Sequence, residues 1–311
     1  CNIGCNISIE NRDSIVYRFL PRLNPQVNDY WLCDYGRFLS ESLNLRDIEK
    51  ASVREGDAAT ETHVPGAIEK IAARIRETVD SAGPAGLFFL GSANLSNEEN
   101  FLLRKIADHL SCGNRDAVVD KSRLRRMKSK TVWVEGDHAG PNFAGAKDVG
   151  LSPGPGSYGL EDVLSGKARP GVILVADAAF SQIADDPEKV AVLRQAGFLA
   201  VAARTANALT RAADVVLPAA SLAEKEGTFT NVQGRVQKFD RAFLPGSSVR
   251  AHWELLLLLA VSLGYGDRNW TPADLRRQIQ TEVEGYAHVT EEELQGGILM
   301  KKGTFVSIGA I

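Results

Sequence analysis

The sequence predicts an α/β protein built on a parallel sheet, preceded by a small β-rich segment that carries cysteines. From about residue 46 onward, short and nearly continuous apolar runs alternate with amphipathic stretches. This alternation is typical of a parallel sheet covered by helices on both faces. Three of the four cysteines lie in the first 33 residues, where no such alternation is seen. We therefore divide the chain into residues 1–45 and residues 46–311.

The composition is that of an ordinary globular protein. The chain has 311 residues, 44% of them hydrophobic and 24% charged, with a net charge of −3. This length favours one large domain or two unequal ones. Because there is no basic excess, we expect no nucleic-acid partner, and the basic run at residues 121–130 is interpreted as a solvated surface loop. No apolar run reaches the roughly 20 residues that span a bilayer.

The first segment is predicted to hold a strand and a turn. Residues 14–20 alternate between apolar and polar side chains, as a strand does, and Pro21 and Pro25 then bracket a turn. A compact aromatic stretch follows at residues 30–33. The charged and weakly patterned residues 50–62 are interpreted as a linker.

The second segment is predicted to alternate between helices and strands. A helix begins after Pro65 and ends before Gly83, where glycine is a common helix terminator. The Gly- and Pro-rich residues 150–159 are expected to form a loop. Further helices are expected at residues 96–110, 188–196, 205–213 and 255–261, and strands at residues 87–90, 131–134, 172–176, 198–203 and 215–217.

The cysteines point to a metal site near the start of the chain. Cys1 and Cys5 are separated by three residues, and Cys5 and Cys33 by twenty-seven. Thiolates in such an arrangement can bind an iron–sulfur cluster or zinc, and the spacing alone leaves both open, together with cysteines that bind nothing. Cys112 lies far from the others and is expected to be a buried or unligated thiol.

Two segments resemble a known family. Residues 1–6 and 27–38, with the sequences CNIGCN and VNDYWLCDYGRF, resemble the iron–sulfur segment of molybdopterin oxidoreductases, and most of all the large iron–sulfur subunit of bacterial NADH–quinone oxidoreductase (complex I). Residues 213–237, ADVVLPAASLAEKEGTFTNVQGRVQ, resemble a second signature of the same family. The resemblance implies the α/β fold of formate dehydrogenase and DMSO reductase, in its first three domains.

The family pattern also implies a metal centre. Its four cysteines are spaced C-x2-C-x3-C-x27-C, and the last three positions correspond to Cys1, Cys5 and Cys33. The first position would lie three residues before Cys1, and since the chain begins with Cys1 we treat it as a fragment. The resemblance therefore implies a [4Fe–4S] cluster in the full-length protein, incomplete or absent in this chain.

The second signature could contact a pterin cofactor or could be structural. Gly227 and Gly234 would allow close backbone approach in a long ordered loop after Pro218, and Arg235 could bind an anion. We favour the structural role, and expect no molybdopterin, for three reasons. Only residues 111–131 occupy the place of a long insert of the molybdenum enzymes, no candidate molybdenum ligand lies between Cys33 and Gly83, and the chain ends at Ile311 without a closing β-rich domain.

Three functions are therefore compared. The favoured one is a fragment of the iron–sulfur electron-transfer subunit of NADH–quinone oxidoreductase, a scaffold without its own active site. Its partners would be the other subunits of the peripheral arm, on the cytoplasmic face of the membrane, with no membrane span of its own. The alternatives are a molybdopterin-dependent oxidoreductase such as the formate dehydrogenase α subunit, and a scaffold with degenerate cysteines. No hydrolase, nucleotide-binding or zinc-protease motif is present, and the five histidines are scattered singly.

Overall fold

A seven-stranded sheet forms the centre of the computed structural model, which describes residues 1–118, 127–128, 133–134, 140–179, 181–296 and 299–300. The strand order is β4-β3-β11-β10-β9-β5-β6. The strands are β3 (Ala51–Glu55), β4 (Ala58–Thr62), β5 (Leu87–Ser92), β6 (Arg115–Val118), β9 (Val172–Val175), β10 (Phe198–Ala203) and β11 (Val215–Pro218). The five strands from β11 to β6 are parallel, as predicted.

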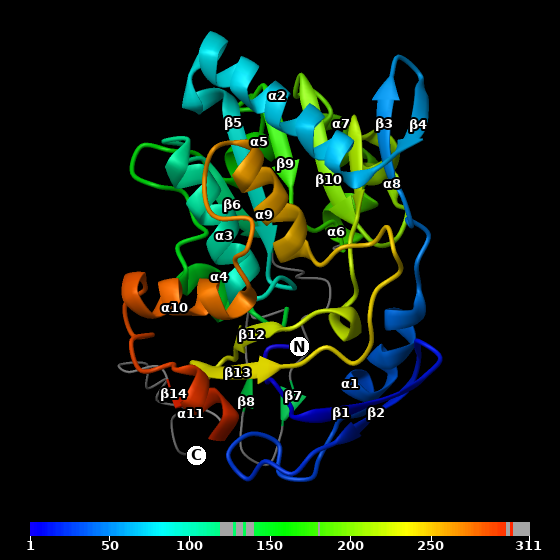
Figure 1. Ribbon diagram of the computed structural model, residues 1–311, viewed down its shortest axis with the longest axis vertical. Helices are drawn as coiled ribbons and strands as arrows, with labels where there is room; N and C mark the ends of the chain where they lie inside the picture. The colour runs from blue at the N-terminus through cyan, green and yellow to red at the C-terminus, as the bar shows by residue number, and fades with distance from the viewer. Residues whose placement is uncertain (119–126, 129–132, 135–139, 180, 297–298, 301–311) are drawn as a thin grey trace.

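Helices cover both faces of this sheet, which confirms the predicted α/β layers (Figure 1). On one face α2 (Val64–Ala82), α3 (Asn97–His109) and α9 (His252–Ser262) pack on Leu87 and Phe89 of β5. On the other face α5 (Leu160–Leu164), α6 (Ser181–Ala184), α7 (Pro187–Leu193) and α8 (Ala208–Ala212) pack on Phe88 and Leu90. Successive residues of β5 thus serve opposite cores, as the pleat of a strand requires.

Residues 50–62 are not a linker, and that prediction was wrong. They form the β3–β4 hairpin, which turns at Gly56 with a φ of 63° and pairs antiparallel with β11 at the edge of the sheet. The side chain of Arg54 donates to the backbone carbonyls of Ala213 and Arg211 and so anchors the hairpin. Because β4 lies at the sheet edge and is largely exposed, it lacks the apolar pattern that marks the inner strands.

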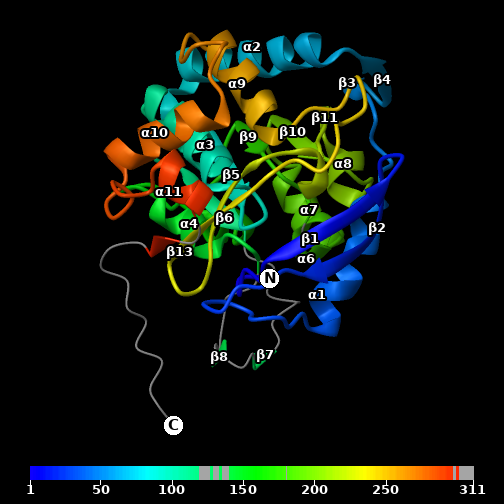
Figure 2. The ribbon, with the colours of Figure 1, turned by 60° about the horizontal axis from the view of Figure 1, so that its bottom comes forward.

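The amino-terminal segment forms a separate two-stranded sheet with short helices. The predicted strand at residues 14–20 is confirmed as β2 (Ile15–Pro21), which pairs with β1 (Ile7–Arg12). The helix α1 (Asp34–Phe38) and the 3-10 helix η1 (Leu39–Asn44) follow and lie beside β2 at one end of the molecule (Figures 1 and 2). Val16 and Phe19 pack against Ala223 of the larger part.

The segment after Pro218 is more regular than the predicted long loop. A 3-10 helix η4 (Leu222–Glu224) leads into the hairpin of β12 (Gly227–Thr230) and β13 (Arg235–Phe239), which β14 (Leu299–Met300) extends. The prediction missed this hairpin because its strands are rich in Gly, Thr and Gln. The helices α4 (Phe143–Asp148), α10 (Pro272–Glu282) and α11 (Glu291–Gly296) lie around it (Figure 1).

The remaining predictions have mixed outcomes. The other expected helices and strands occur within a few residues of their predicted bounds, and residues 151–159 form a loop. Of the strand expected at residues 131–134, β8 (Trp133–Val134) is present, but it pairs with β7 (Met127–Lys128) outside the central sheet. Residues 131–132 and most of the basic run 121–130 lie outside the described residues. In the described part of the chain, no helix is long and apolar enough to cross a membrane.

Candidate functional site

Polar side chains meet where the central strands end. Ser92 ends β5, Asp177 follows β9 and Arg204 follows β10. The Ser92 hydroxyl donates to Asp177 Oδ2 across 2.7 Å. Since ligands of open α/β sheets bind at the carboxyl ends of the strands, this crevice is the first place to look for a site.

The first turn of α3 brings buried acids to the crevice. Ser96 caps the helix and exchanges hydrogen bonds with Glu99, and both residues are fully buried, with Glu98 almost so. A serine followed three residues later by glutamate is a capping box, which satisfies two amide donors of the helix. Glu98 Oε1 accepts from the Thr228 hydroxyl, and Glu99 Oε1 lies 3.8 Å from His252 Nδ1.

Three buried or half-buried ion pairs neutralise acids around this crevice. Lys225 Nζ lies 2.6 Å from Glu99 Oε2, with both side chains almost fully buried. Arg276 of α10 lies 3.2 Å from Glu98 Oε1. Arg46 pairs with Glu224 of η4 and donates to the backbone carbonyl of Ala219. Each of the three acids is thus paired with a cation, and the three cations come from different parts of the chain.

The hairpin is held against α3 by neutral hydrogen bonds as well. The Thr228 amide and hydroxyl both donate to Glu98, at 2.9 Å, and the Asn97 side chain donates to the hydroxyls of Thr228 and Thr230. At Gly227 an added Cβ would lie 2.7 Å from the Ser96 Cβ. The glycine of the second signature therefore allows strand β12 to approach the end of α3 closely.

His252, at the start of α9, is buried between these charges. Its Nδ1 lies 3.4 Å from Lys225 Nζ and 3.8 Å from Glu99 Oε1, and its Nε2 lies 3.9 Å from Asp177 Oδ1. Burial, followed by the neighbouring Lys225, lowers the pKa of His252 to about 3, against the opposing effect of Asp177. The ring is therefore neutral at physiological pH.

The crevice contains buried polar atoms without hydrogen-bond partners, and the cavity beside His252 is small. Among the described residues, Glu99 Oε1, His252 Nε2, Arg204 Nη1 and Ser221 Oγ are buried without a hydrogen-bond partner. The cavity beside His252 is lined mainly by aliphatic side chains and has a volume of about 10 Å³, roughly the room that a single water molecule needs. This cavity alone is too small for a pterin.

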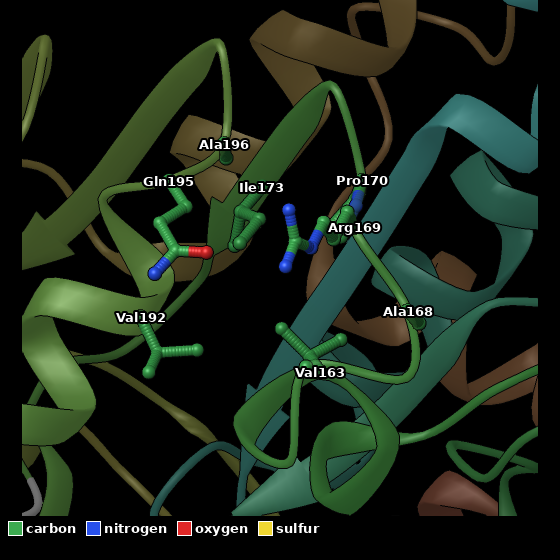
Figure 3. A pocket seen from close by; sticks show the side chains of 9 residues that line it. Val163, Ala168, Arg169, Pro170, Ile173, Val192, Gln195 and Ala196 are labelled. Carbon is green, nitrogen blue, oxygen red and sulfur yellow. The ribbon is translucent and has the colours of Figure 1, made fainter.

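A second recess, at the opposite ends of the strands, is equally small. Val163, Ile173 and Val192 line it together with Arg169 and Gln195 (Figure 3). Its volume is also about 10 Å³. Ile173 lies near the beginning of β9, so this recess is at the end of the sheet where ligands of such folds are uncommon.

Arg235, predicted to bind an anion, contacts neutral side chains. Its guanidinium donates to Gln26 Oε1 at 2.6 Å and to Gln233 Oε1 at 3.2 Å. Burial lowers its pKa from the ordinary value. Arg235 thus joins the hairpin to the amino-terminal segment, and Gly234 makes the turn before it with a φ of 77°.

The three candidate ligand cysteines lie in the amino-terminal segment. Cys1 and Cys5 pack against Ile3 and Val27. Cys33 is exposed, caps α1 and accepts a hydrogen bond from the Gly36 amide. The pKa of Cys5 is raised, first by burial and then by its electrostatic interaction with the nearby Cys33. A cation between the two sulfurs would reverse that repulsion.

The thiols do not by themselves form a closed metal site. In the described part of the chain, no group of three or more Cys, His, Asp or Glu side chains is close enough to hold a metal ion. The donors have the soft character that iron–sulfur clusters require, and the ligand assignment of Cys1, Cys5 and Cys33 stays a prediction. Cys112 is buried, as expected, and burial raises its pKa.

Sequence reasoning missed the buried charge cluster at the strand ends. His252, Asp177 and Glu99 are far apart in the sequence, and no motif joins them. The only local signals were the acids after Ser96 and the alternating charges of Glu224, Lys225 and Glu226.

Comparison with known proteins gives two family matches. Residues 2–41 match the NADH-ubiquinone oxidoreductase NDSU1/NuoG-like 4Fe-4S domain, a stretch that includes Cys5 and Cys33. Residues 137–261 match the molybdopterin oxidoreductase family, a stretch that includes the β12–β13 hairpin and His252.

The similar proteins include NADH-quinone oxidoreductase subunits and formate dehydrogenase subunits. The G subunit of NADH-quinone oxidoreductase from Escherichia coli is 36% identical over 107 residues, which are 34% of this chain and 11% of that protein. The F420-dependent formate dehydrogenase subunit alpha of Methanocaldococcus jannaschii is 36% identical over 118 residues, 36% of this chain and 18% of that protein. The matched regions thus span less than a fifth of these relatives.

A solved structure shares the fold. Acetylene hydratase from Pelobacter acetylenicus superposes with a TM-score of 0.67 over 97% of this chain and 73% of its own, at 11% sequence identity. This likeness confirms the expected molybdopterin-oxidoreductase-like fold. The chain thus contains one stretch similar to the NDSU1/NuoG-like 4Fe-4S domain and one similar to the molybdopterin oxidoreductase family, and part of it is similar to the NADH-quinone oxidoreductase G subunit.

Proposed function

We propose that this chain is part of the iron–sulfur electron-transfer subunit of an NADH–quinone oxidoreductase, and that its α/β body is a scaffold without an active site of its own. The main support is the crevice at the strand ends. Lys225–Glu99 and Arg276–Glu98 are internal ion pairs in the place where a cofactor of this fold would bind. Removing a charge from water is costly, and a buried charge that loses its partner is strongly destabilising. Opening either pair would therefore cost stability.

In this proposal residues 1–45 are the remnant of the 4Fe–4S segment and residues 46–311 are the body. Cys1, Cys5 and Cys33 would supply three thiolates to one cluster in the full-length protein. The other subunits of the peripheral arm would cover the body, and the whole would lie on the cytoplasmic face of the membrane through that assembly.

The second candidate is a molybdopterin-dependent oxidoreductase. It is favoured by the formate dehydrogenase relatives, which match this chain at 36% to 42% identity. Against it stands the small volume beside His252 and the neutral contacts of Arg235.

Metal analysis of the full-length protein separates these candidates. We would purify it without oxygen from its own host and measure iron and molybdenum per chain. Iron without molybdenum supports the electron-transfer scaffold, whereas about one molybdenum per chain would establish the pterin enzyme.

Cysteine variants of the full-length protein test the ligand assignment. Cys5→Ala and Cys33→Ala are each expected to lower the iron content by about four atoms per chain, the content of one cluster. Cys112→Ala is the matched control, since this buried thiol lies in the α/β body, and it should leave the iron unchanged. Unchanged iron in all three variants would favour a scaffold with degenerate cysteines.

A further inference from the structure

Residues 1–5, which we call the cysteine loop, lie against the β12–β13 hairpin (Figure 1). Three successive backbone carbonyls of this loop each accept a hydrogen bond from the hairpin. The three contacts are Val232 N to Asn2 O at 2.8 Å, Asn231 Nδ2 to Ile3 O at 3.1 Å and Gln237 Nε2 to Gly4 O at 2.8 Å. They join the stretch that is similar to the 4Fe-4S domain to the stretch that is similar to the molybdopterin oxidoreductase family.

The side chain of Asn231 is fixed by the turn of the hairpin. Asn231 is 1% exposed, and its Oδ1 accepts from the backbone amides of Gln233 and Arg235, both at 2.9 Å. Because the oxygen is engaged in the turn, the NH2 group of the same side chain is directed to the cysteine loop, where it donates to Ile3. Asn231 thus connects the conformation of the turn to that of the loop.

The cysteine loop approaches the hairpin too closely for a side chain at position 4. Gly4 has a φ of 72°, and an added Cβ would meet Gln237 Oε1 and lie 2.9 Å from Asn231 Cβ. Glycine adopts this backbone conformation readily, whereas other residues do so at a cost. Ile3 is buried and packs with Val27 and the two cysteines of the loop. Hydrogen bonds and apolar packing therefore hold the loop in one conformation.

The Gly4–Cys5 peptide relates Gln237 to a sulfur atom. A trans peptide directs its N–H opposite to its carbonyl, so the Cys5 N–H points away from the Gln237 side chain that binds the Gly4 carbonyl. Burial raises the pKa of Cys5 most, and a hydrogen bond from its own backbone N–H is among the effects that lower it. Hydrogen bonds to the sulfurs help to set the reduction potential of an iron–sulfur cluster. Gln237 thus orients the peptide whose N–H acts on the Cys5 sulfur.

We propose that Asn231 and Gln237 are positioning residues for the metal site, which hold the cysteine loop in the conformation in which Cys1 and Cys5 bind a cluster. Gln237 in addition sets the direction of the Cys5 N–H. This inference rests on the proposed function, because it takes the two cysteines as cluster ligands from there. It assigns two residues of the second signature to the cysteines and not to a pterin.

The hairpin also contacts the amino-terminal segment outside the cysteine loop. Arg235 Nη1 donates to Gln26 Oε1 at 2.6 Å, and Gln26 is exposed. Removing the Gln26 side chain weakens the junction of the two segments but leaves the three hydrogen bonds of the cysteine loop in place. Gln26→Ala is therefore the matched control, because it separates positioning of the cysteines from attachment of the whole segment.

Gln237→Met tests the proposal in the full-length protein, purified without oxygen. Methionine is similar in length and uncharged, but it donates no hydrogen bond to Gly4. The cluster to follow is the one whose electron paramagnetic resonance signal is absent from Cys5→Ala. We expect an iron chelator to remove this signal at least fivefold faster from Gln237→Met than from the parent. We also expect a lower reduction potential, because weaker hydrogen bonding to sulfur favours the oxidised, less negatively charged cluster.

Gly4→Ala is the second variant, since it changes the contact from the side of the loop and leaves the hairpin sequence intact. It should shift both measurements in the same direction, whereas Gln26→Ala should leave both at the values of the parent. A parent-like release rate and potential in Gln237→Met, or equal changes in Gln26→Ala, would refute the positioning role while Cys5→Ala still loses the signal. A signal that persists in Cys5→Ala overturns instead the ligand assignment of the proposed function, and the inference with it.

Discussion

Replacing Lys225 by methionine removes the only cation within 3 Å of the fully buried Glu99 carboxylate among the described residues. The carboxylate would keep the Ser96 amide as a donor at 2.8 Å, but it would be left charged and unpaired in the interior. Breaking a buried ion pair from one side costs about 3–5 kcal/mol. We therefore expect Lys225→Met to lower the free energy of unfolding by about that amount.

The double variant Glu99→Gln with Lys225→Met separates charge from packing. The introduced glutamine side chain retains an oxygen that can accept from the Ser96 amide, and no charge remains buried at this position. We expect most of the lost stability to return, so that the double variant lies within about 1–2 kcal/mol of the parent. Lys50→Met is the surface control: its partner Glu61 is exposed, and such exposed pairs contribute little to stability.

Urea unfolding followed by circular dichroism and tryptophan fluorescence measures these differences. Coincident transitions and equal m-values are needed before the midpoints are compared. The reasoning fails if Lys225→Met costs no more than Lys50→Met, or if the double variant is as unstable as the single one. Either result would mean that Lys225 and Glu99 do not depend on each other as buried charges.

Three further variants probe the same region. His252→Asn tests the lowered pKa of His252. In the unfolded chain this histidine takes up a proton below its ordinary pKa of 6.5, whereas in the folded protein it stays neutral down to a pH of about 3. The free energy of unfolding present above pH 6.5 is therefore lost as the pH falls, by up to about 1.4 kcal/mol per pH unit. Urea titrations between pH 7 and 4.5 should show a flatter loss in His252→Asn, and identical slopes would contradict the assignment. Ser96→Ala removes the α3 cap and should cost about 0.5–2 kcal/mol, measured by urea unfolding, whereas no loss would mean that the cap hydrogen bonds are dispensable. Gly91→Ala places a Cβ 2.7 Å from Asn100 Oδ1 and against Leu151, so thermal unfolding should show a stability lower by about 1–3 kcal/mol. The control Gly246→Ala adds a Cβ in open space and should leave the stability nearly unchanged. Equal effects of the two variants would refute the steric argument.

The strands that the sequence revealed are those buried on both faces. Val172–Val175 and Phe198–Ala203 are continuous apolar runs, and a parallel sheet between two helical layers requires such runs. The strands that escaped prediction are exposed or polar. β4 lies at an edge, β6 contains Arg115 and Asp116, and β12 consists mainly of Gly and Thr. Their pairing depends on neighbours far away in the chain, which local periodicity does not encode.

For the candidate site, too, some features are visible in the local sequence and others arise only from the fold. The cysteine spacing is visible in the sequence, but by itself it leaves an iron–sulfur cluster, zinc and unligated cysteines open, and the ligand assignment stays a prediction. The burial of His252 between Lys225 and Asp177 could not, since it arises only when α9, η4 and the end of β9 meet in space. A lone histidine in an ordinary local sequence gives no sign of this environment.

The internal charges support the β12–β13 hairpin and the start of α3 together. The β12–β13 hairpin brings hydroxyls and amides to the end of α3, and these groups need partners when water is excluded. Glu98 and Asn97 supply them, and Arg276 and Lys225 balance the acids that result. Residues of the second signature and of α3 and α10 thus hold one another in place. Removing any one of them leaves its partner's charge or hydrogen-bonding group unpaired in the interior, and the cost of that unpaired group couples the members of the set.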